Sequence, residues 1–194
     1  MEFSKFIESE GQQVSKDVGE HVFMQGDSDD SLYLIKQGVV KAYYLTSDGQ
    51  ERVKSFLTDH DVIGSMSAAY QKQKATFGLI CLEPTQLLKF SFERLYQQSQ
   101  NNHQLAREVI DILLAFAMKK EARERELLCL SAEQRYQQLL DKSPDLMEKV
   151  TQNDIARYLG VTPVGLSRIK HRLIDASISK QSKPKPDSPK SVIR

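Results

Sequence analysis

Short apolar runs, separated by turn signals, dominate the first ninety residues of the chain. Asp48-Gly49 lies between two of these runs, and Asp-Gly between β-forming segments is a strong signal for a hairpin. Many short strands at close spacing are typical of a β-sandwich or jelly roll rather than a parallel sheet. We therefore predict strands at residues 22–23, 32–35, 39–45, 53–57, 77–82 and 86–90.

The pattern becomes helical after Ser91. Residues 101–130 contain no Gly or Pro and consist mainly of helix formers. The first half of this segment is apolar around more of its circumference than packing on one side requires. Such a helix typically buries one face on its own domain and another on a partner, so we interpret it as a dimerisation helix. A single long core helix is the alternative.

Two further short helices are predicted within residues 151–173. Gly160 suits the left-handed position that ends a helix sharply, and Thr162 followed by Pro163 suits the start of the next helix. Two short helices that meet at such a corner form a helix-turn-helix, a common DNA-binding unit. An ordinary helical hairpin is the alternative interpretation.

One face of the second helix is expected to contact DNA. Leu166, Ile169 and Leu173 form its inward stripe, so the opposite face would lie in the major groove. Arginine can bond bidentately to guanine, whereas residues that flank the face would contact phosphates. The candidate DNA-binding residues are Thr162, Val164, Ser167, Arg168, Lys170, His171 and Arg172.

The distribution of charge supports this location. Residues 151–194 contain nine Lys/Arg and three Asp/Glu, giving +6, whereas residues 1–150 carry −5. A basic segment on an acidic body favours a polyanion as partner. The alternative is a solvated basic tail, because residues 180–194 supply five of the nine positive charges. We expect residues 179–194, which are rich in proline and lysine, to lack regular structure.

Several classes of function are disfavoured. No apolar run approaches the roughly 20 residues that a membrane helix needs, and no secretory signal is visible at the N-terminus. The two cysteines, Cys81 and Cys129, cannot form a disulfide framework or a Cys-x-x-Cys metal site. No catalytic motif is recognisable. We therefore expect a cytoplasmic protein without a membrane segment, with no catalytic residues, and with neither metal nor cofactor.

A cluster of three carboxylates is the remaining candidate for a metal site. Asp27, Asp29 and Asp30 lie close together in the sequence. The segment lacks the downstream Gly and Glu of a calcium-binding loop. We therefore interpret the cluster as a solvated turn.

The order of these elements resembles the Crp–Fnr family of bacterial regulators. The resemblance covers about residues 19–173 and is carried by GEHVFMQGDSDDSLYLIKQGVVKAYYLTSDGQER at residues 19–52, by Asp-Val-Ile-Gly at 61–64, by Leu-Glu-Pro-Thr-Gln-Leu-Leu at 82–88 and by the helix-turn-helix. It implies an α+β fold with an N-terminal cyclic-nucleotide-binding-like jelly roll, a long dimerisation helix and a C-terminal helix-turn-helix domain.

The resemblance also divides the chain and suggests its partners. It implies an effector domain at residues 1–100, a dimerisation helix at 101–130, a helix-turn-helix domain at 131–178 and a tail at 179–194. The implied partners are a second copy of the chain, a palindromic double-stranded DNA operator, a small-molecule effector and, as a further candidate, RNA polymerase.

The effector site departs from the family pattern. Cyclic-AMP binders in this family carry a Gly-Glu pair and an Arg on the phosphate, and these positions here are Gly64-Ser65 and Ala75. The neighbouring Lys74 does not replace the fork of an arginine. We predict that the domain does not bind cyclic AMP in the usual way. The candidate effector-pocket residues are Gly64, Ser65, Met66, Lys74, Ala75 and Thr76.

Other departures keep a second hypothesis open. The N-terminus lacks the cysteine cluster of the oxygen-sensing branch, so no iron–sulfur cluster is expected. Pro163 and Val164 stand where relatives often have Arg and Glu, and the family's β-hairpin wing looks shortened or absent. The alternative is a cyclic-nucleotide or other small-ligand sensor that acts through protein partners and has a degenerate helix-turn-helix.

Overall fold

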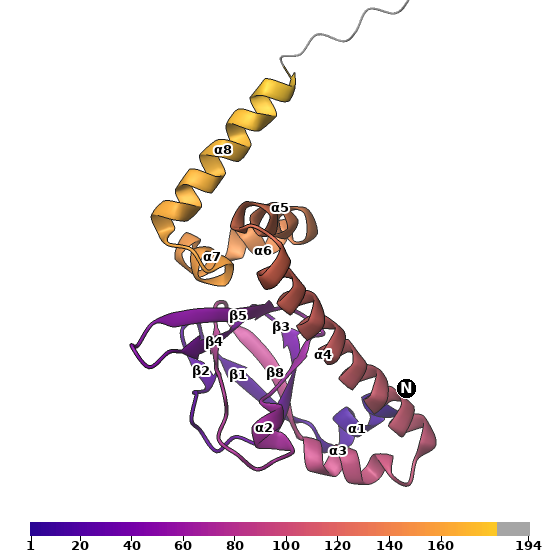
Figure 1. The fold of residues 1–194 in the computed structure, drawn as a ribbon. Coiled ribbons are helices and arrows are strands. Elements are labelled where there is room, and N and C mark those ends of the chain that lie inside the picture. The colour runs from indigo at the N-terminus through magenta and orange to yellow at the C-terminus, as the bar shows by residue number, and fades with distance from the viewer. Residues whose placement is uncertain (182–194) are drawn as a thin grey trace, which may run out of the picture.

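The computed structural model of the chain describes residues 1–181 (Figure 1). Within this range, two four-stranded sheets in the orders β1-β8-β3-β6 and β2-β7-β4-β5 form a β-sandwich. Every strand pair is antiparallel. The strands are β1 Gln12–Lys16, β2 His21–Phe23, β3 Ser31–Gln37, β4 Val40–Leu45, β5 Glu51–Leu57, β6 Val62–Ile63, β7 Gly78–Cys81 and β8 Thr85–Ser91.

All six predicted strand segments are strands in the structure, and the Asp48-Gly49 turn joins β4 to β5. The sequence pattern missed β1 and β6, which are the two edge strands of one sheet. Both strands offer too few apolar positions to form a recognisable alternating pattern. Only Val14 is apolar in β1, and β6 has two residues.

The core of the sandwich lies between the two sheets. Large apolar side chains from both sheets meet there, because residues that alternate along each strand point to the same face. Burial of this apolar area supplies the main favourable term in folding. The core is formed by Phe23, Tyr33, Ile35, Val40, Ala42, Leu57, Ile63, Ala75, Phe77, Leu79, Cys81 and Leu87.

Eight helices complete the described part of the chain. They are α1 Glu2–Glu10, α2 Met66–Ala69, α3 Phe92–Ser99, α4 His103–Cys129, α5 Ala132–Lys142, α6 Pro144–Lys149, α7 Gln152–Leu159 and α8 Pro163–Gln181. The long helix predicted at residues 101–130 is α4. Asn102 caps it by accepting hydrogen bonds from the backbone N–H groups of Gln104 and Leu105 at 3.1 Å each.

Helix α4 links the two ends of the molecule. It begins beside α1 and α3, runs along the β-sandwich and ends at the helical region of α5–α8 (Figure 1). Leu105 and Val109, in its first turns, are buried against these neighbouring helices. Ser131 then starts α5 with a capping box, in which its hydroxyl accepts from Gln134 N at 3.2 Å and Gln134 Oε1 accepts from Ser131 N at 2.9 Å.

The last described helix is longer than predicted. Residues 174–181, where a β-hairpin wing would begin, continue α8 as a helix. Residues 179–181 are therefore helical, although we predicted that the tail would be irregular from residue 179. The rest of the predicted tail, residues 182–194, lies outside the described residues. None of the helices in residues 1–181 is long and apolar enough to cross a membrane.

Gly64 allows a close approach between two strands of the sandwich. A Cβ atom at this position would lie 2.6 Å from the carbonyl oxygen of Ser31 and 2.4 Å from a methyl group of Leu32. We predict that Gly64→Ala lowers the free energy of unfolding by about 1–3 kcal/mol because backbone must move to accommodate the methyl group. Urea denaturation measures this loss, with the exposed-site change Gln71→Ala as control. An unchanged midpoint would contradict the close approach.

Candidate nucleic-acid interface

The first helix of the predicted helix-turn-helix is α7, and its start is defined by a side-chain cap. The hydroxyl of Thr151 accepts a hydrogen bond from Asp154 N at 3.1 Å and donates one to Asp154 Oδ2 at 2.7 Å. The helix ends at Gly160, whose φ of 70° is left-handed, and Val161 N then donates to Ala156 O at 3.0 Å. These local contacts produce the sharp corner that the sequence predicts.

The second helix, α8, begins with the predicted cap. Thr162 Oγ1 accepts from Gly165 N at 3.1 Å, and Pro163 takes the first helical position, where its missing N–H costs no hydrogen bond. The inward stripe of α8 packs on α7, as predicted, and Leu166 and Ile169 are buried while Leu173 is half-buried. The two helices therefore meet at a sharp corner around one apolar core.

The opposite face of α8 is open to solvent. The exposed fraction of Val164 is 61%, and Thr162, Ser167, Arg168, His171 and Arg172 are also exposed. Within the part of the chain that the structure describes, Arg168 forms no hydrogen bond or ion pair. Its guanidinium group is therefore available to an external partner.

Besides Thr162, which caps α8, two basic candidate residues are engaged within the chain. Lys170 is half-buried and donates to Gln152 Oε1 of α7 at 3.0 Å. Arg172 Nε lies 3.0 Å from Glu133 Oε2 of α5. Both side chains point back along the protein surface, so a phosphate would have to compete with these partners.

A buried ion cluster joins α7 to the β-sandwich. Lys41 Nζ of β4 lies 2.8 Å from Glu51 Oε1 of β5 and 2.8 Å from Asp154 Oδ1 of α7. Arg157 extends the cluster at its rim, with its guanidinium 3.2 Å from Glu51 Oε1 and 3.8 Å from Asp154 Oδ1. Sequence reasoning missed this cluster. The available signal was Lys41 itself, a single charge inside the apolar run of residues 39–45.

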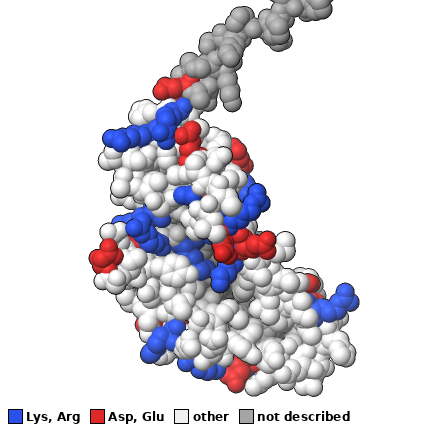
Figure 2. Space-filling view, in the orientation of Figure 1, with Lys and Arg blue, Asp and Glu red and all other residues white. Residues whose placement is uncertain are grey.

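Aromatic packing accompanies the ion cluster. Tyr158 of α7 lies between Phe56 of β5, with ring centroids 5.4 Å apart, and the guanidinium of Arg123 of α4, which is 3.7 Å from the ring centroid. Burial raises the pKa of Tyr158. Helix α7 therefore contacts the β-sandwich and α4 at the same time. In Figure 2, basic side chains gather where the helical region meets the β-sandwich, next to a group of acidic ones.

The two segments predicted to form the effector pocket lie side by side. Thr76 N donates to Ser65 Oγ at 3.3 Å. Gly64, Ser65 and Ala75 are buried, Met66 is half-buried and packs against the helices at this end of the sandwich, and Thr76 is exposed. The hydroxyl of Ser65 is thus engaged by the backbone, and the Ala75 side chain is part of the sandwich core.

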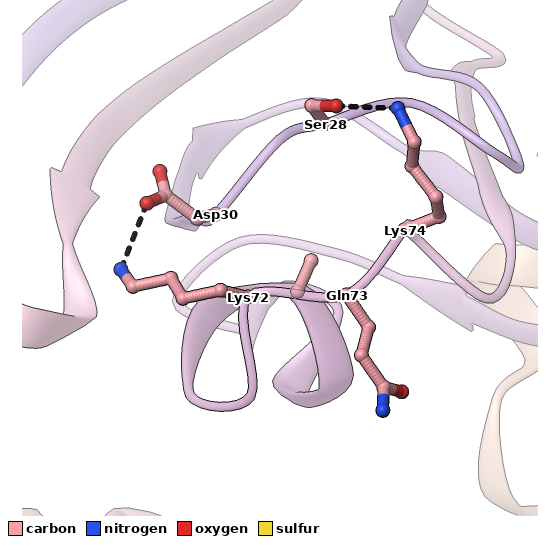
Figure 3. Close-up of a pocket in the computed structure, with 6 residues that line it drawn as sticks. Ser28, Asp30, Lys72, Gln73 and Lys74 are labelled. Atoms are coloured by element: carbon pink, nitrogen blue, oxygen red, sulfur yellow. Dashed lines mark hydrogen bonds and ion pairs between the residues drawn. The ribbon is translucent and has the colours of Figure 1, made fainter.

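Lys74 contacts the neighbouring loop that contains Ser28. Its amine donates to Ser28 Oγ at 2.6 Å, across an open surface hollow of about 490 Å³ (Figure 3). Lys72, on the other side of the hollow, pairs with Asp30 at 2.9 Å. The structure therefore brings together the two backbone segments of the predicted pocket but directs its one basic side chain elsewhere. The hollow is lined by Ser28, Asp30, Ala68, Lys72, Gln73 and Lys74.

The three carboxylates considered as a metal site each have separate partners. Asp27 accepts from Met24 N at 2.7 Å, Asp29 accepts from Tyr33 OH at 2.6 Å, and Asp30 pairs with Lys72. Among the residues that the structure describes, no group of three or more His, Cys, Asp or Glu side chains is arranged to hold a metal ion.

Comparisons with known proteins identify a family model that matches the β-sandwich region and relatives that match most of the chain. Residues 13–102 match the family model described as a cyclic nucleotide-binding domain. The transcriptional activator protein Anr of Pseudomonas protegens is 26% identical over 164 residues, which cover 78% of this chain and 66% of that protein. The chain thus spans about two thirds of the length of the curated relatives that it matches.

Two of the similar solved structures cover most of this chain. FixK2 from Bradyrhizobium japonicum superposes with a TM-score of 0.72 at 19% identity, covering 87% of this chain and 86% of that one. The c-di-GMP responsive global regulator CLP of Xanthomonas campestris superposes with a TM-score of 0.73 at 19% identity, covering 90% and 91%. These likenesses establish the predicted α+β fold, with sandwich, long helix and C-terminal helical region.

The corner between α7 and α8 depends on one residue. We predict that Gly160→Ala destabilises the chain by about 1 kcal/mol because an L-residue is strained at a left-handed φ. The matched control is Gly165→Ala inside α8, where a Cβ atom would have only Thr162 Oγ1 and Val161 Cβ near it, at 3.3 and 3.5 Å. Thermal unfolding of both variants measures the difference. Equal effects of the two changes would refute the role of the corner.

Proposed function

Because the chain belongs to the Crp–Fnr family of regulators, we propose that it is a dimeric, sequence-specific DNA-binding transcription regulator. The observation that carries the proposal is the exposed face of α8, on which Arg168 has no partner within the described chain. The curated relative named above, Anr, is a transcriptional activator rather than an enzyme. Because this relative regulates transcription, we infer a cytoplasmic location.

The geometry of α8 supports major-groove reading. Ser167 and Arg168 lie next to each other on its exposed face, and Val164 precedes them by one turn. Arg168 would bond to guanine O6 and N7, Ser167 to a base or a phosphate, and Val164 to a thymine methyl group. The N-terminus of α8, at Thr162, would approach a phosphate. Because Pro163 and Val164 replace residues common in relatives, the half-site would differ from theirs.

The long helix supports a dimer. Its first turns are buried on one side, but the other side leaves apolar residues exposed at Ile110, Leu114 and Met118, with exposed fractions of 54%, 55% and 69%. These residues are spaced four apart and so share one face of α4. Leu128, 77% exposed, continues this face near the end of the helix. We infer that the occupant is α4 of a second copy, because a palindromic operator requires a two-fold partner.

The effector domain is proposed to respond to something other than cyclic AMP bound in the usual way. The position of the expected carboxylate is Ser65, which is 1% exposed, and that of the expected guanidinium is Ala75, which is 2% exposed. Neither side chain can hold a ribose hydroxyl or a phosphate as Glu and Arg would. We propose RNA polymerase as a candidate protein partner.

Selection of bound sequences from random double-stranded DNA, with and without cyclic AMP, tests the function. We expect an inverted repeat to be enriched equally in both conditions. A cyclic-AMP requirement would contradict our interpretation of Ser65 and Ala75. Failure to enrich any sequence at low salt would favour the alternative, a ligand sensor that acts through protein partners.

Arg168 is predicted to read one base pair of each half-site. Arg168→Ala should weaken operator binding by about 1–3 kcal/mol per contact and relax the preference at that position, because a bidentate bond to guanine is lost. Fluorescence anisotropy with operator variants measures both effects. The control is Arg52→Ala, which removes an exposed cation on β5. If the two variants behaved alike, α8 would not be the reading helix.

The apolar face of α4 is predicted to hold the dimer together. Leu114→Asp should convert the dimer to a monomer at micromolar concentration, because it would bury an unpaired charge at the interface. Sedimentation velocity measures the assembly state. Val18→Asp, the same type of change at an exposed apolar residue near the β1–β2 turn, is the control. A Leu114→Asp protein that remained dimeric would exclude this face.

A further inference from the structure

Four charged side chains attach the DNA-binding region to the effector domain. Lys41 of β4 lies between Glu51 of β5 and Asp154 of α7, at 2.8 Å from each. The side chains of Lys41 and Asp154 are only 7% and 8% exposed. Arg157 closes the cluster from the solvent side, through its contact of 3.2 Å with Glu51. These short, largely buried ion contacts lie beside an apolar contact, in which Val39, Phe56 and Leu82 of the sandwich pack with the core of the helical region.

Such a cluster contributes more to geometry than to stability. Removing two charges from water is costly, so a buried ion pair often stabilises no better than apolar residues of the same volume. Its buried charges, however, must stay paired, because separating them would leave an uncompensated charge away from water. The neighbouring rings of Phe56 and Tyr158, tilted by 41°, carry no such requirement. Apolar packing thus holds α7 against the sandwich, and the paired charges of Lys41 and Asp154 favour one position of α7 within that contact.

The position of α7 determines the position of α8. The two helices share the apolar core around the corner at Gly160. On the other side, Arg135 of α5 donates to Leu159 O of α7 at 2.8 Å and to Leu130 O, at the end of α4, at 2.6 Å. Direct contacts therefore join the end of α4, α5, α7 and α8, and the ion cluster links this group of helices to the β4–β5 hairpin.

We propose that Lys41 is a positioning residue for DNA recognition: through Asp154, Glu51 and Arg157 it fixes α8 against the effector domain and so sets the distance between the two recognition helices of the dimer. The inference rests on the proposed function. None of the four residues belongs to the reading face, and the attached arrangement leaves Ser167 and Arg168 exposed. In this proposal, the attached arrangement is the state that binds DNA.

A consequence for operator recognition follows. Two recognition helices held at a fixed separation fit half-sites about one helical turn apart, roughly 34–36 Å centre to centre. Inserting or removing one base pair between the half-sites shifts and rotates one of them, so a rigid dimer loses affinity. If the attachment is loosened, α8 can follow the displaced half-site. Discrimination between spacings then falls, although each α8 still reads its own half-site.

The test compares Lys41→Met with the unmodified full-length chain on the selected operator and on versions with one base pair added or removed at its centre. We expect the unmodified chain to lose about tenfold or more on each altered spacing, which is the usual effect of a defect in a site. For Lys41→Met, we expect affinity for the correct operator to fall about tenfold and the spacing penalty to shrink below about threefold. Affinity for non-specific DNA should be unchanged.

Two further variants separate positioning from folding. Lys72→Met is the matched control, because it removes an effector-domain lysine that also pairs with two carboxylates, Asp30 and Glu93, at 2.9 Å each, but far from α7 in the fold. Glu51→Gln keeps the shape of its side chain and tests the cluster if Lys41→Met does not fold. If Lys41 and Glu51 act as one unit, the effects of Lys41→Met and Glu51→Gln should not add in the double variant. The double variant should then show a spacing penalty no smaller than the smaller penalty of the two single variants.

The contrary results are distinct. A folded Lys41→Met protein that kept the full spacing penalty, or one that bound all DNA more weakly by the same factor, would overturn the positioning role. Tighter operator binding by Lys41→Met would show that attachment is inhibitory and would also overturn it. If the unmodified chain bound no operator, the proposed function itself would fail, and this inference would fail with it.

Discussion

The contact between Lys41 and Asp154 is the constraint on which the rest of the arrangement depends. A lysine buried at this depth requires carboxylate partners, and two are supplied from different parts of the fold, Glu51 from the neighbouring strand and Asp154 from α7. Asp154 also binds the hydroxyl of Thr151, which caps α7. One carboxylate thus binds the hydroxyl that caps the first helix of the predicted helix-turn-helix and also links that helix to the β-sandwich.

Local signals predicted most of the DNA-binding region. Gly160, Thr162 and Pro163 act on the backbone at their own positions, so the corner between α7 and α8 could be derived without knowledge of the fold. The six predicted strands were found in the same way. The edge strand β1 and the short helices α1 and α3 were missed, because their formation depends on packing against distant segments.

The ion cluster and the effector site could not be derived from local patterns. Lys41 and Asp154 are separated by 113 positions, and a lone lysine in an apolar strand does not reveal its partner. The family resemblance placed Ser65 and Ala75 in one pocket. The structure does bring their segments together, since Thr76 N binds Ser65 Oγ, but it turns Lys74 toward Ser28. Side-chain direction on a loop is decided by tertiary neighbours, which the sequence pattern does not contain.

One strand pair connects the proposed effector domain to the proposed reading helix. The β4–β5 hairpin belongs to the effector domain, yet Lys41, Glu51 and Phe56 of this hairpin contact α7 directly. A structure of the dimer bound to a duplex that carries the selected inverted repeat tests this account most directly. It should place α8 in the major groove with the Arg168 guanidinium on a guanine edge, while Lys41 Nζ remains between Glu51 and Asp154. A complex in which α8 lay outside the groove, or in which Lys41 and Asp154 had separated, would contradict it.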